Sequence, residues 1–138
     1  PRSCNFAVWW DGDLLREILD RNFISKWNWA EGTETRLLSA EDCTSNNGTK
    51  STPALSTDLF GDWREELIER TSDNKELRIY TTTIPTEHRL YTLMHDPQYR
   101  LAIAWQNVAY NQPPWPGFFL GQGMAPAPRP NITLVPSK

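Results

Sequence analysis

The sequence predicts an all-β fold: about two blades of a β-propeller, incomplete, with one short helix and a Pro/Gly-rich C-terminal tail. A long segment repeats within the chain, and short aromatic or β-branched stretches follow one another with turn residues between them. Only one stretch shows the three- and four-residue spacing of a helix.

The repeat pairs Trp9–Arg21 (WWDGDLLREILDR) with Asp58–Arg70 (DLFGDWREELIER), 49 positions further along the chain. A period of roughly 40–50 residues is typical of propeller blades, each of which is a four-stranded antiparallel sheet. Each repeat should therefore hold about four short strands. Since two blades cannot close a ring, we expect residues 1–138 to be a fragment of a larger propeller, with completion by partner chains as the alternative.

Three stretches are expected to be strands because they are rich in aromatic and β-branched residues. They are Phe6–Trp10, Ile24–Trp29 and Leu77–Ile84. Asp73–Lys75 precedes the last of them and predicts a hairpin turn.

A helix is predicted over Gln98–Tyr110, after an N-cap at Asp96 and a proline in the first turn. Apolar residues recur along it at three- and four-residue spacing and should form one buried face. That face consists of Leu101, Ala104, Trp105 and Val108. Most of the seven tryptophans, especially Trp9, Trp10 and Trp105, are expected in the core.

The chain after Asn111 is rich in Pro and Gly (PPWPGFFLGQGMAPAPRP), which predicts an irregular tail along the surface. Trp115, Phe118 and Phe119 are expected to hold it in place. Cys4 and Cys43 allow either one disulfide or two free thiols, and the sequence leaves both open.

Composition excludes some partners. A net charge of −3 and a pI near 5.4 argue against nucleic-acid binding. No apolar run approaches the roughly 18–20 residues of a membrane helix, so no membrane partner is expected. A mildly acidic protein can still bind an acidic polysaccharide if a metal ion bridges the two.

The second repeat carries the elements of a calcium loop. Carboxylates stand at positions 1, 5 and 9 of DLFGDWREE, as Asp58, Asp62 and Glu66, and Gly61 permits a tight turn. Calcium takes about six to eight oxygen ligands, so such a turn must supply several carboxylates. The pattern resembles the D-x-[DN]-G-D-x-x-x-[DE] repeats of integrin-type propellers, from which Phe60 departs at position 3.

The first repeat keeps Asp11, Asp13 and Glu17 but has Trp9 at position 1. Calcium is therefore the expected cofactor of both loops. The alternative in each case is a solvated acidic turn.

Between the repeats lies the polar segment Ser45–Pro53 (SNNGTKSTP), which forms turns and has no hydrophobic face. From composition it is a plain hairpin loop. It also presents amide, hydroxyl and carbonyl oxygens around one lysine, which is the material of a binding site.

Three long stretches closely resemble the end of family-eleven polysaccharide lyases: CTSNNGTKSTPALSTDLFGDWREELIERT, LRIYTTTIPTEHRLYTLMHDPQYRLAIAWQNVAYNQPP and PGFFLGQGM. These lyases are eight-bladed propellers that cut rhamnogalacturonan, the branched backbone of pectin. The resemblance runs from Cys4 to about Pro130. It implies that the chain is the C-terminal part of the catalytic domain of a secreted, calcium-dependent enzyme, with the remaining blades as partners.

The resemblance also implies where the cleft lies. One part matches Asn47, Gly48, Thr49 and Lys50, and the other matches Asn107 and Tyr110 at the end of the predicted helix. Other cleft residues would come from blades outside this chain, so the isolated segment should be inactive. The sequence leaves open whether the parent enzyme cuts internally or from chain ends.

The reaction explains the choice of groups. A β-elimination removes the proton from C5 of galacturonate and expels the group on C4, and calcium on the carboxylate would neutralise its charge. A nearby divalent cation also disfavours a protonated lysine, which makes Lys50 the expected base. Tyr110 is the rival base or the acid for the leaving oxygen. Asn47 and Asn107 would hold calcium or sugar hydroxyls.

Weaker candidates are His88 and His95 as acid–base groups, against a role as surface or capping residues, and Trp115 as a platform for a sugar ring. Two other functions compete with the lyase. One is a non-catalytic calcium-binding propeller used for adhesion. The other is a carbohydrate-binding segment that grips pectin without cutting it.

Overall fold

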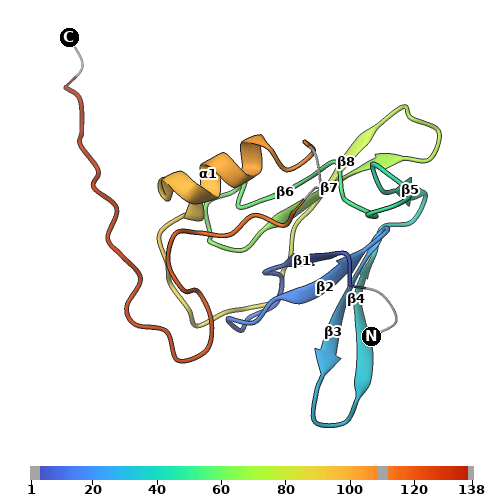
Figure 1. The fold of residues 1–138 in the computed structure, drawn as a ribbon, viewed down its shortest axis with the longest axis horizontal. Helices are drawn as coiled ribbons and strands as arrows, with labels where there is room; N and C mark the ends of the chain where they lie inside the picture. Colours follow the sequence, from blue (N-terminus) through green and yellow to red (C-terminus); the bar gives the residue numbers. More distant parts are fainter. Residues whose placement is uncertain (1–3, 109–111, 137–138) are drawn as a thin grey trace.

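Two antiparallel sheets, one short α-helix and a long extended tail make up the chain in the computed structural model, which describes residues 4–108 and 112–136 (Figure 1). The first sheet contains β1 (Phe6–Val8), β2 (Glu17–Asp20), β3 (Phe23–Asn28) and β4 (Thr33–Ser39), in that order. The predicted all-β class is confirmed. The described residues form two open sheets, and the propeller stays a proposal.

In the second sheet β7 (Glu66–Thr71) is central. It pairs with β8 (Leu77–Tyr80) on one edge and with β5 (Cys43–Thr44) and β6 (Leu55–Thr57) on the other. The 49-residue offset places β6 on β1 and β7 on β2, and β8 pairs with β7 as β3 pairs with β2, after a longer turn. Within the described part of the chain, no strand pairs with the outer edge of β8, where β4 lies in the first sheet.

The predicted hairpin turn before β8 is confirmed. Asn74 has a φ of 60°, and Asp73 Oδ1 accepts hydrogen bonds from Thr71 Oγ1 (2.7 Å) and Lys75 N–H (3.1 Å). The strand itself ends at Tyr80, four residues before the predicted Ile84. The next residue is Thr81, whose hydroxyl donates to Glu66 Oε1 on β7 at 3.0 Å.

The core consists of two clusters that meet at the tryptophan pair. Trp10 belongs to a cluster between the sheets, with Phe6, Val8, Leu19, Ile24 and Leu67. Trp9 belongs to a cluster beneath the helix, with Trp63, Leu93, Tyr99 and Leu120. The expectation that Trp9 and Trp10 fill core positions is confirmed, and as neighbours they join both clusters.

The helical region contains a 3-10 helix η1 (Leu93–His95) and the α-helix α1 (Pro97–Ala104), which ends earlier than predicted. The cap is as predicted, since Asp96 Oδ1 accepts from Tyr99 N–H at 2.8 Å and proline follows it. The N-terminal side of α1 also packs under the tail, where Gly117 N–H donates to Asp96 Oδ1 at 2.9 Å.

The predicted buried face of the helix is wrong. Leu101, Trp105 and Val108 are 46–64% exposed, and Ala104 is exposed as well. The buried residues are Tyr99, Ala102 and Gln106 instead. Polar anchors decide the rotation, because Gln106 exchanges two hydrogen bonds of 2.7 Å with the backbone of Ser56 on β6.

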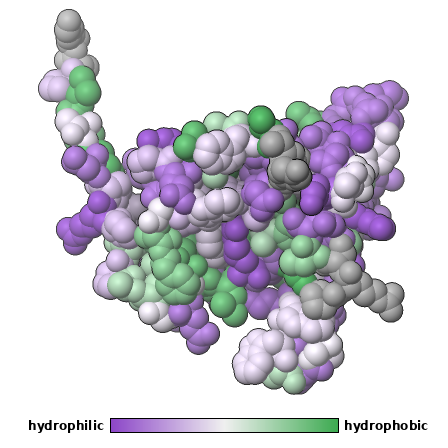
Figure 2. All heavy atoms as spheres, in the orientation of Figure 1, coloured by the Kyte–Doolittle hydropathy of each residue, from purple (hydrophilic) through white to green (hydrophobic). Residues whose placement is uncertain are grey.

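The tail after position 112 runs as irregular chain, as predicted, past α1 and then away from the sheets (Figure 1). Leu120 is buried and Phe118 half-buried, whereas Trp115 and Phe119 are exposed, so the tail is held by a partly different set of side chains from the one expected. Figure 2 shows hydrophobic side chains gathered over the tail segment next to α1. No helix in the described ranges has the length and apolarity needed to cross a membrane.

Candidate functional site

The polar loop Ser45–Pro53 leaves the second sheet at β5 and returns at β6, and Asn47 holds its shape. Asn47 Oδ1 accepts from Lys50 N–H at 2.7 Å, and Asn47 Nδ2 donates to Thr52 Oγ1 at 2.7 Å. Asn46 N–H donates to Thr52 O at 2.7 Å, which closes the loop at its base. Both polar groups of the Asn47 side chain therefore serve the turn.

Lys50 lies exposed at the end of this turn, after the exposed Gly48 and Thr49. Ser51, which follows, is buried and has a φ of 51°, in the left-handed region that non-glycine residues rarely adopt. Such conformations persist where surrounding contacts enforce them. The turn around Lys50 is thus held by the Asn47 side chain and by the left-handed conformation of Ser51.

The second half of the predicted cleft lies against this loop. Asn107 Oδ1 accepts from Asn46 Nδ2 at 3.0 Å, and Asn107 Nδ2 donates to Ala54 O at 2.6 Å. Asn46 and Asn107, which are 61 positions apart, are therefore brought together. Tyr110 lies outside the described residues.

The two acidic loops share one frame. We call Trp9–Glu17 loop 1 and Asp58–Glu66 loop 2. In loop 1 Glu17 Oε2 accepts two successive backbone N–H groups at 2.8 and 3.3 Å, and in loop 2 Glu66 Oε2 accepts two at 2.8 and 3.0 Å. The donors are Trp10 and Asp11 in loop 1, and Leu59 and Phe60 in loop 2. The ninth residue of each repeat thus fixes the start of its loop.

Loop 1 contains a carboxylate cluster with a lysine inside it. Oxygens of Asp11, Asp13 and Glu17 all lie within 4.8 Å of one another. Lys26 Nζ, from β3, lies 2.6 Å from Asp11 Oδ2 and 2.6 Å from Asp13 Oδ2. It also lies 3.0 Å from Glu17 Oε1. The ammonium therefore bridges all three acidic residues.

In loop 2 the three carboxylates point to separate partners. Asp58 Oδ2 accepts from Leu93 N–H at 2.7 Å, while its Oδ1 is buried with no hydrogen-bond partner among the described residues. Asp62 pairs with Arg64 Nη2 at 2.8 Å. Among the described residues, Glu66 Oε1 accepts only the Thr81 hydroxyl, at 3.0 Å. The oxygens of Asp58, Asp62 and Glu66 do not converge as those of loop 1 do: within the described ranges, loop 1 holds the only such cluster of three.

Burial raises the pKa of carboxyl groups in both loops. It raises the pKa of Glu17, against a hydrogen bond from Lys26, and it raises the pKa of Glu66 and of Asp58 in loop 2. Ionised carboxylates are disfavoured in such surroundings unless a cation is present. Loop 1 contains such a cation, whereas Glu66 and Asp58 have none beside them among the contacts described.

The positions of these carboxylates show whether each loop could hold a calcium ion. Loop 1 does not fit the ion as it stands, because an ammonium already occupies the space between its carboxylates. Loop 2 fits better, since it carries a buried Asp58 oxygen without a partner and no lysine, although Asp62 would have to leave Arg64.

A buried network that the sequence reasoning missed connects the two repeats. Arg16 Nη2 lies 3.1 and 3.2 Å from the two oxygens of Glu65, which is fully buried. Glu65 also accepts from Tyr99 Oη at 2.7 Å and from Trp9 N–H at 3.0 Å. Tyr99 Oη in turn accepts from Asp58 N–H at 3.0 Å. The signal was present: Arg16 and Glu65 are 49 positions apart and occupy the same place in successive repeats.

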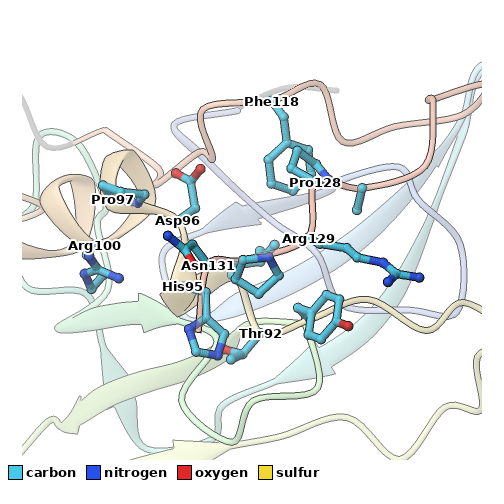
Figure 3. A pocket seen from close by; sticks show the side chains of 13 residues that line it. Thr92, His95, Asp96, Pro97, Arg100, Phe118, Pro128, Arg129 and Asn131 are labelled. Atoms are coloured by element: carbon cyan, nitrogen blue, oxygen red, sulfur yellow. The ribbon is translucent and has the colours of Figure 1, made fainter. Parts of the chain in front are cut away.

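A cavity of about 470 Å³ lies between the start of α1 and the tail. Its lining includes Tyr91, His95, Arg100, Phe118, Arg129 and Asn131. Figure 3 shows Arg100 on one side and Arg129 on the other, with His95 and Asn131 between them. Of this set, the sequence singled out only His95 as a candidate functional residue and Phe118 as an anchor of the tail. His88 instead lies edge-on to the Trp63 ring, with 6.3 Å between ring centroids.

Both cysteines are free thiols. Cys4 is exposed and Cys43 is buried, where its Sγ lies 3.3 Å from Tyr80 Oη. Of the two possibilities that the sequence left open, the structure therefore has the pair of thiols.

Comparison with known proteins agrees with the resemblance seen in the sequence. The model of rhamnogalacturonan lyase family 11, C-terminal domain, matches residues 1–130. The rhamnogalacturonan endolyase YesW of Bacillus subtilis (strain 168) is 65% identical over 132 residues, which is 96% of this chain and 21% of that protein. The rhamnogalacturonan exolyase YesX of the same strain is 53% identical over 146 residues, covering 100% of this chain and 24% of that protein.

Two solved structures share the fold. The crystal structure of rhamnogalacturonan lyase YesW matches with a TM-score of 0.91 at 65% identity, over 96% of this chain and 23% of that one. Bacillus licheniformis rhamnogalacturonan lyase PL11 matches with a TM-score of 0.92 at 59% identity, over 97% and 23%. The chain thus spans less than a quarter of the length of the curated relatives it matches.

Proposed function

Because the chain belongs to rhamnogalacturonan lyase family 11, we propose that it forms part of the catalytic domain of an enzyme that cleaves rhamnogalacturonan by β-elimination. The observation that carries the proposal is the hydrogen bond between Asn46 and Asn107. It joins the polar loop of Lys50 to the segment that leads to Tyr110. A cleft built from these two segments is what the reaction needs, since acid and base must reach neighbouring atoms of one sugar ring.

In the proposed reaction Lys50 accepts the proton from C5 of galacturonate. The C5–H electron pair forms the double bond to C4, and the bond from C4 to the rhamnosyl oxygen breaks. Tyr110 gives that oxygen its proton, or exchanges roles with Lys50. The exposure of Lys50 on a fixed turn supports its part, because a base must reach the substrate without losing its position.

The other cleft residues divide into two groups. Asn47 is proposed to act mainly by positioning, since both its polar groups are used inside the loop. Gly48 and Thr49 are exposed beside Lys50 and are proposed to contact the sugar. Asn107 positions the loop by its bonds to Asn46 and Ala54 and borders the same space.

Calcium is proposed as the cofactor. On the substrate carboxylate it would neutralise charge that resists loss of the C5 proton. Within this chain loop 2 is the proposed site, with Asp58, Asp62 and Glu66 as ligands. The unpartnered Asp58 oxygen supports that choice. Calcium there would stabilise the fold by offsetting the repulsion among buried carboxylates.

The remaining blades of an eight-bladed propeller are the proposed partners of this segment, and the parent enzyme is proposed to be secreted. The outer edge of β8 supports the first point. Leu77 and Ile79 are more than half exposed there, and no strand of the described chain covers this edge. An unpaired edge of this kind is normally covered in a native protein.

A second candidate function is carbohydrate binding without cleavage, and the cavity beside α1 favours it. Arg100 and Arg129 bring positive charge to a space that also holds Tyr91 and His95. Arginine suits a sugar carboxylate because its guanidinium can donate two parallel hydrogen bonds. The adhesion alternative has no comparable observation in its favour.

The test is Lys50→Ala in the full-length parent protein, with absorbance of the unsaturated galacturonate product as the readout. Turnover should fall by at least about 100-fold, the low end for losing an acid–base group. Lys75→Ala is the matched control, because Lys75 is also an exposed lysine after a turn but lies outside the cleft. Near-normal turnover in Lys50→Ala would overturn the assignment, as would full activity of this segment alone.

A further inference from the structure

The strand opposite each acidic loop brings one side chain to the loop's final glutamate. On β2 and β3 Ile18 pairs with Ser25, so the next pair along the ladder is Glu17 with Lys26. On β7 and β8 Leu67 pairs with Tyr80, so the next pair is Glu66 with Thr81. The contacts agree, because each of these glutamates uses Oε1 for that partner, at 3.0 Å in both repeats. Lys26 and Thr81 therefore occupy one structural position.

We infer that Lys26 is the built-in cation of loop 1, that its ammonium takes the place of a metal ion, and that its removal turns loop 1 into a calcium site. The three donors of an ammonium group match three acceptors, and here they are Asp11, Asp13 and Glu17. Calcium binds such oxygens at about 2.3–2.6 Å, close to the 2.6 Å that separates Lys26 Nζ from both aspartates.

The surroundings keep this cation in place. Burial alone would lower the pKa of Lys26, but hydrogen bonds to Asp11, Asp13 and Glu17 raise it above the ordinary value. The side chain also extends from β3, which is paired along both its edges and so cannot move away freely. A divalent ion would have to displace a paired ammonium before it could bind the three carboxylates.

In loop 2 the position equivalent to Lys26 holds a threonine. The threonine hydroxyl of Thr81 satisfies one oxygen of Glu66 and brings no charge. The inference deepens the calcium proposal for loop 2 but does not rest on it or on the lyase reaction. Loop 1 and loop 2 can be tested separately, so the failure of one leaves the other standing.

The experiment compares calcium binding by wild type and Lys26→Thr in the full chain, using titration calorimetry with calcium alone and thermal melting with and without it. Lys26→Thr copies the residue that the second repeat carries. It should bind one calcium more per chain than wild type and should melt at a lower temperature without calcium. Millimolar calcium should restore most of that loss.

Two further variants serve as controls. Lys75→Thr makes the same chemical change at an exposed lysine and should gain no calcium. Lys26→Thr combined with Asp13→Asn removes a ligand and should lose the additional ion. The inference is overturned if Lys26→Thr folds but binds no additional calcium, or if it fails to fold even in millimolar calcium. It is also overturned if the single variant Asp13→Asn binds less calcium than the wild type, since loop 1 would then already hold calcium.

Discussion

Loop 1 and loop 2 occupy equivalent positions in the two repeats, and in both the final glutamate accepts hydrogen bonds from the start of the loop. They differ in the groups that contact their acidic side chains. In both, the last glutamate accepts two backbone N–H groups at the loop's start. In loop 1 a lysine from the facing strand neutralises the carboxylates, whereas loop 2 has a threonine there. The repeat therefore fixes the hydrogen-bond frame, while the facing strand brings a cation to loop 1 and a neutral hydroxyl to loop 2.

The largest expected effect tests whether the two repeats are one cooperative unit. Glu65→Gln should lower the free energy of unfolding by about 3–5 kcal/mol, because it leaves Arg16 without its buried ionic partner. Denaturant unfolding measures the loss. Glu76→Gln, at an exposed ion pair with Arg78, is the control and should change stability little. If both variants behave alike, the network does not couple the loops.

The next effect concerns Asp20 and Glu69, which occupy the same repeat position on β2 and β7. Asp20 accepts from Asn5 Nδ2 at 2.9 Å, whereas both oxygens of Glu69 are buried without a hydrogen-bond partner among the described residues. Burial raises the pKa of Glu69 from 4.5 to about 8, against the lowering effect of Arg70. Between these values the unfolded chain releases a proton that the folded chain keeps, so stability falls as pH rises through this window.

Glu69→Gln should remove this pH dependence. The variant should be more stable than wild type at pH 8, by about 2–3 kcal/mol, and no more stable near pH 4.5. Unfolding at several pH values measures it. Equal pH profiles for the two proteins would show that Glu69 gains a partner in solution.

The smallest expected effect is the difference in stability between substitutions at Gly12 of loop 1 and Gly61 of loop 2. A Cβ on Gly12 would lie 2.4 Å from Pro85 O, whereas a Cβ on Gly61 would make an ordinary contact with Thr92 Cβ at 3.7 Å, but Gly61 has a φ of 80°. Asparagine tolerates the left-handed conformation, so Gly61→Asn should cost only a few tenths of a kcal/mol and Gly12→Asn about 1–2 kcal/mol. Thermal melting orders the two variants. The reverse order would show that the left-handed φ at Gly61 costs more stability than the close contact at Gly12.

Local signals in the sequence predicted much of the fold. Aromatic and β-branched stretches located β1, β3 and β8, Asp96 capped α1, and Asp73–Lys75 formed its turn, because each depends on neighbouring residues. The helix face was wrong because Tyr99 and Gln106 are fixed by bonds to residues more than 40 positions away. Periodicity cannot register such bonds.

The candidate site was also predicted only in part, because the sequence shows local spacing but not contacts between distant residues. The spacing of Asp11, Asp13 and Glu17 indicated a cluster, and the structure brings these residues together. Lys26 was missed because its contact with Glu17 depends on the pairing of β2 with β3, which the spacing within one loop does not reveal. Loop 2 has a different spacing, with Asp58 at position 1 and Phe60 where loop 1 has Asp11, and contacts with Leu93 and Arg64 hold its carboxylates apart.

A crystal structure of this chain grown in millimolar calcium tests the contrast between the loops most directly. The account predicts anomalous density for an ion about 2.3–2.6 Å from oxygens of Asp58, Asp62 and Glu66, with Lys26 Nζ still between the carboxylates of loop 1. An ion bound by Asp11, Asp13 and Glu17, with Lys26 turned away, would contradict it.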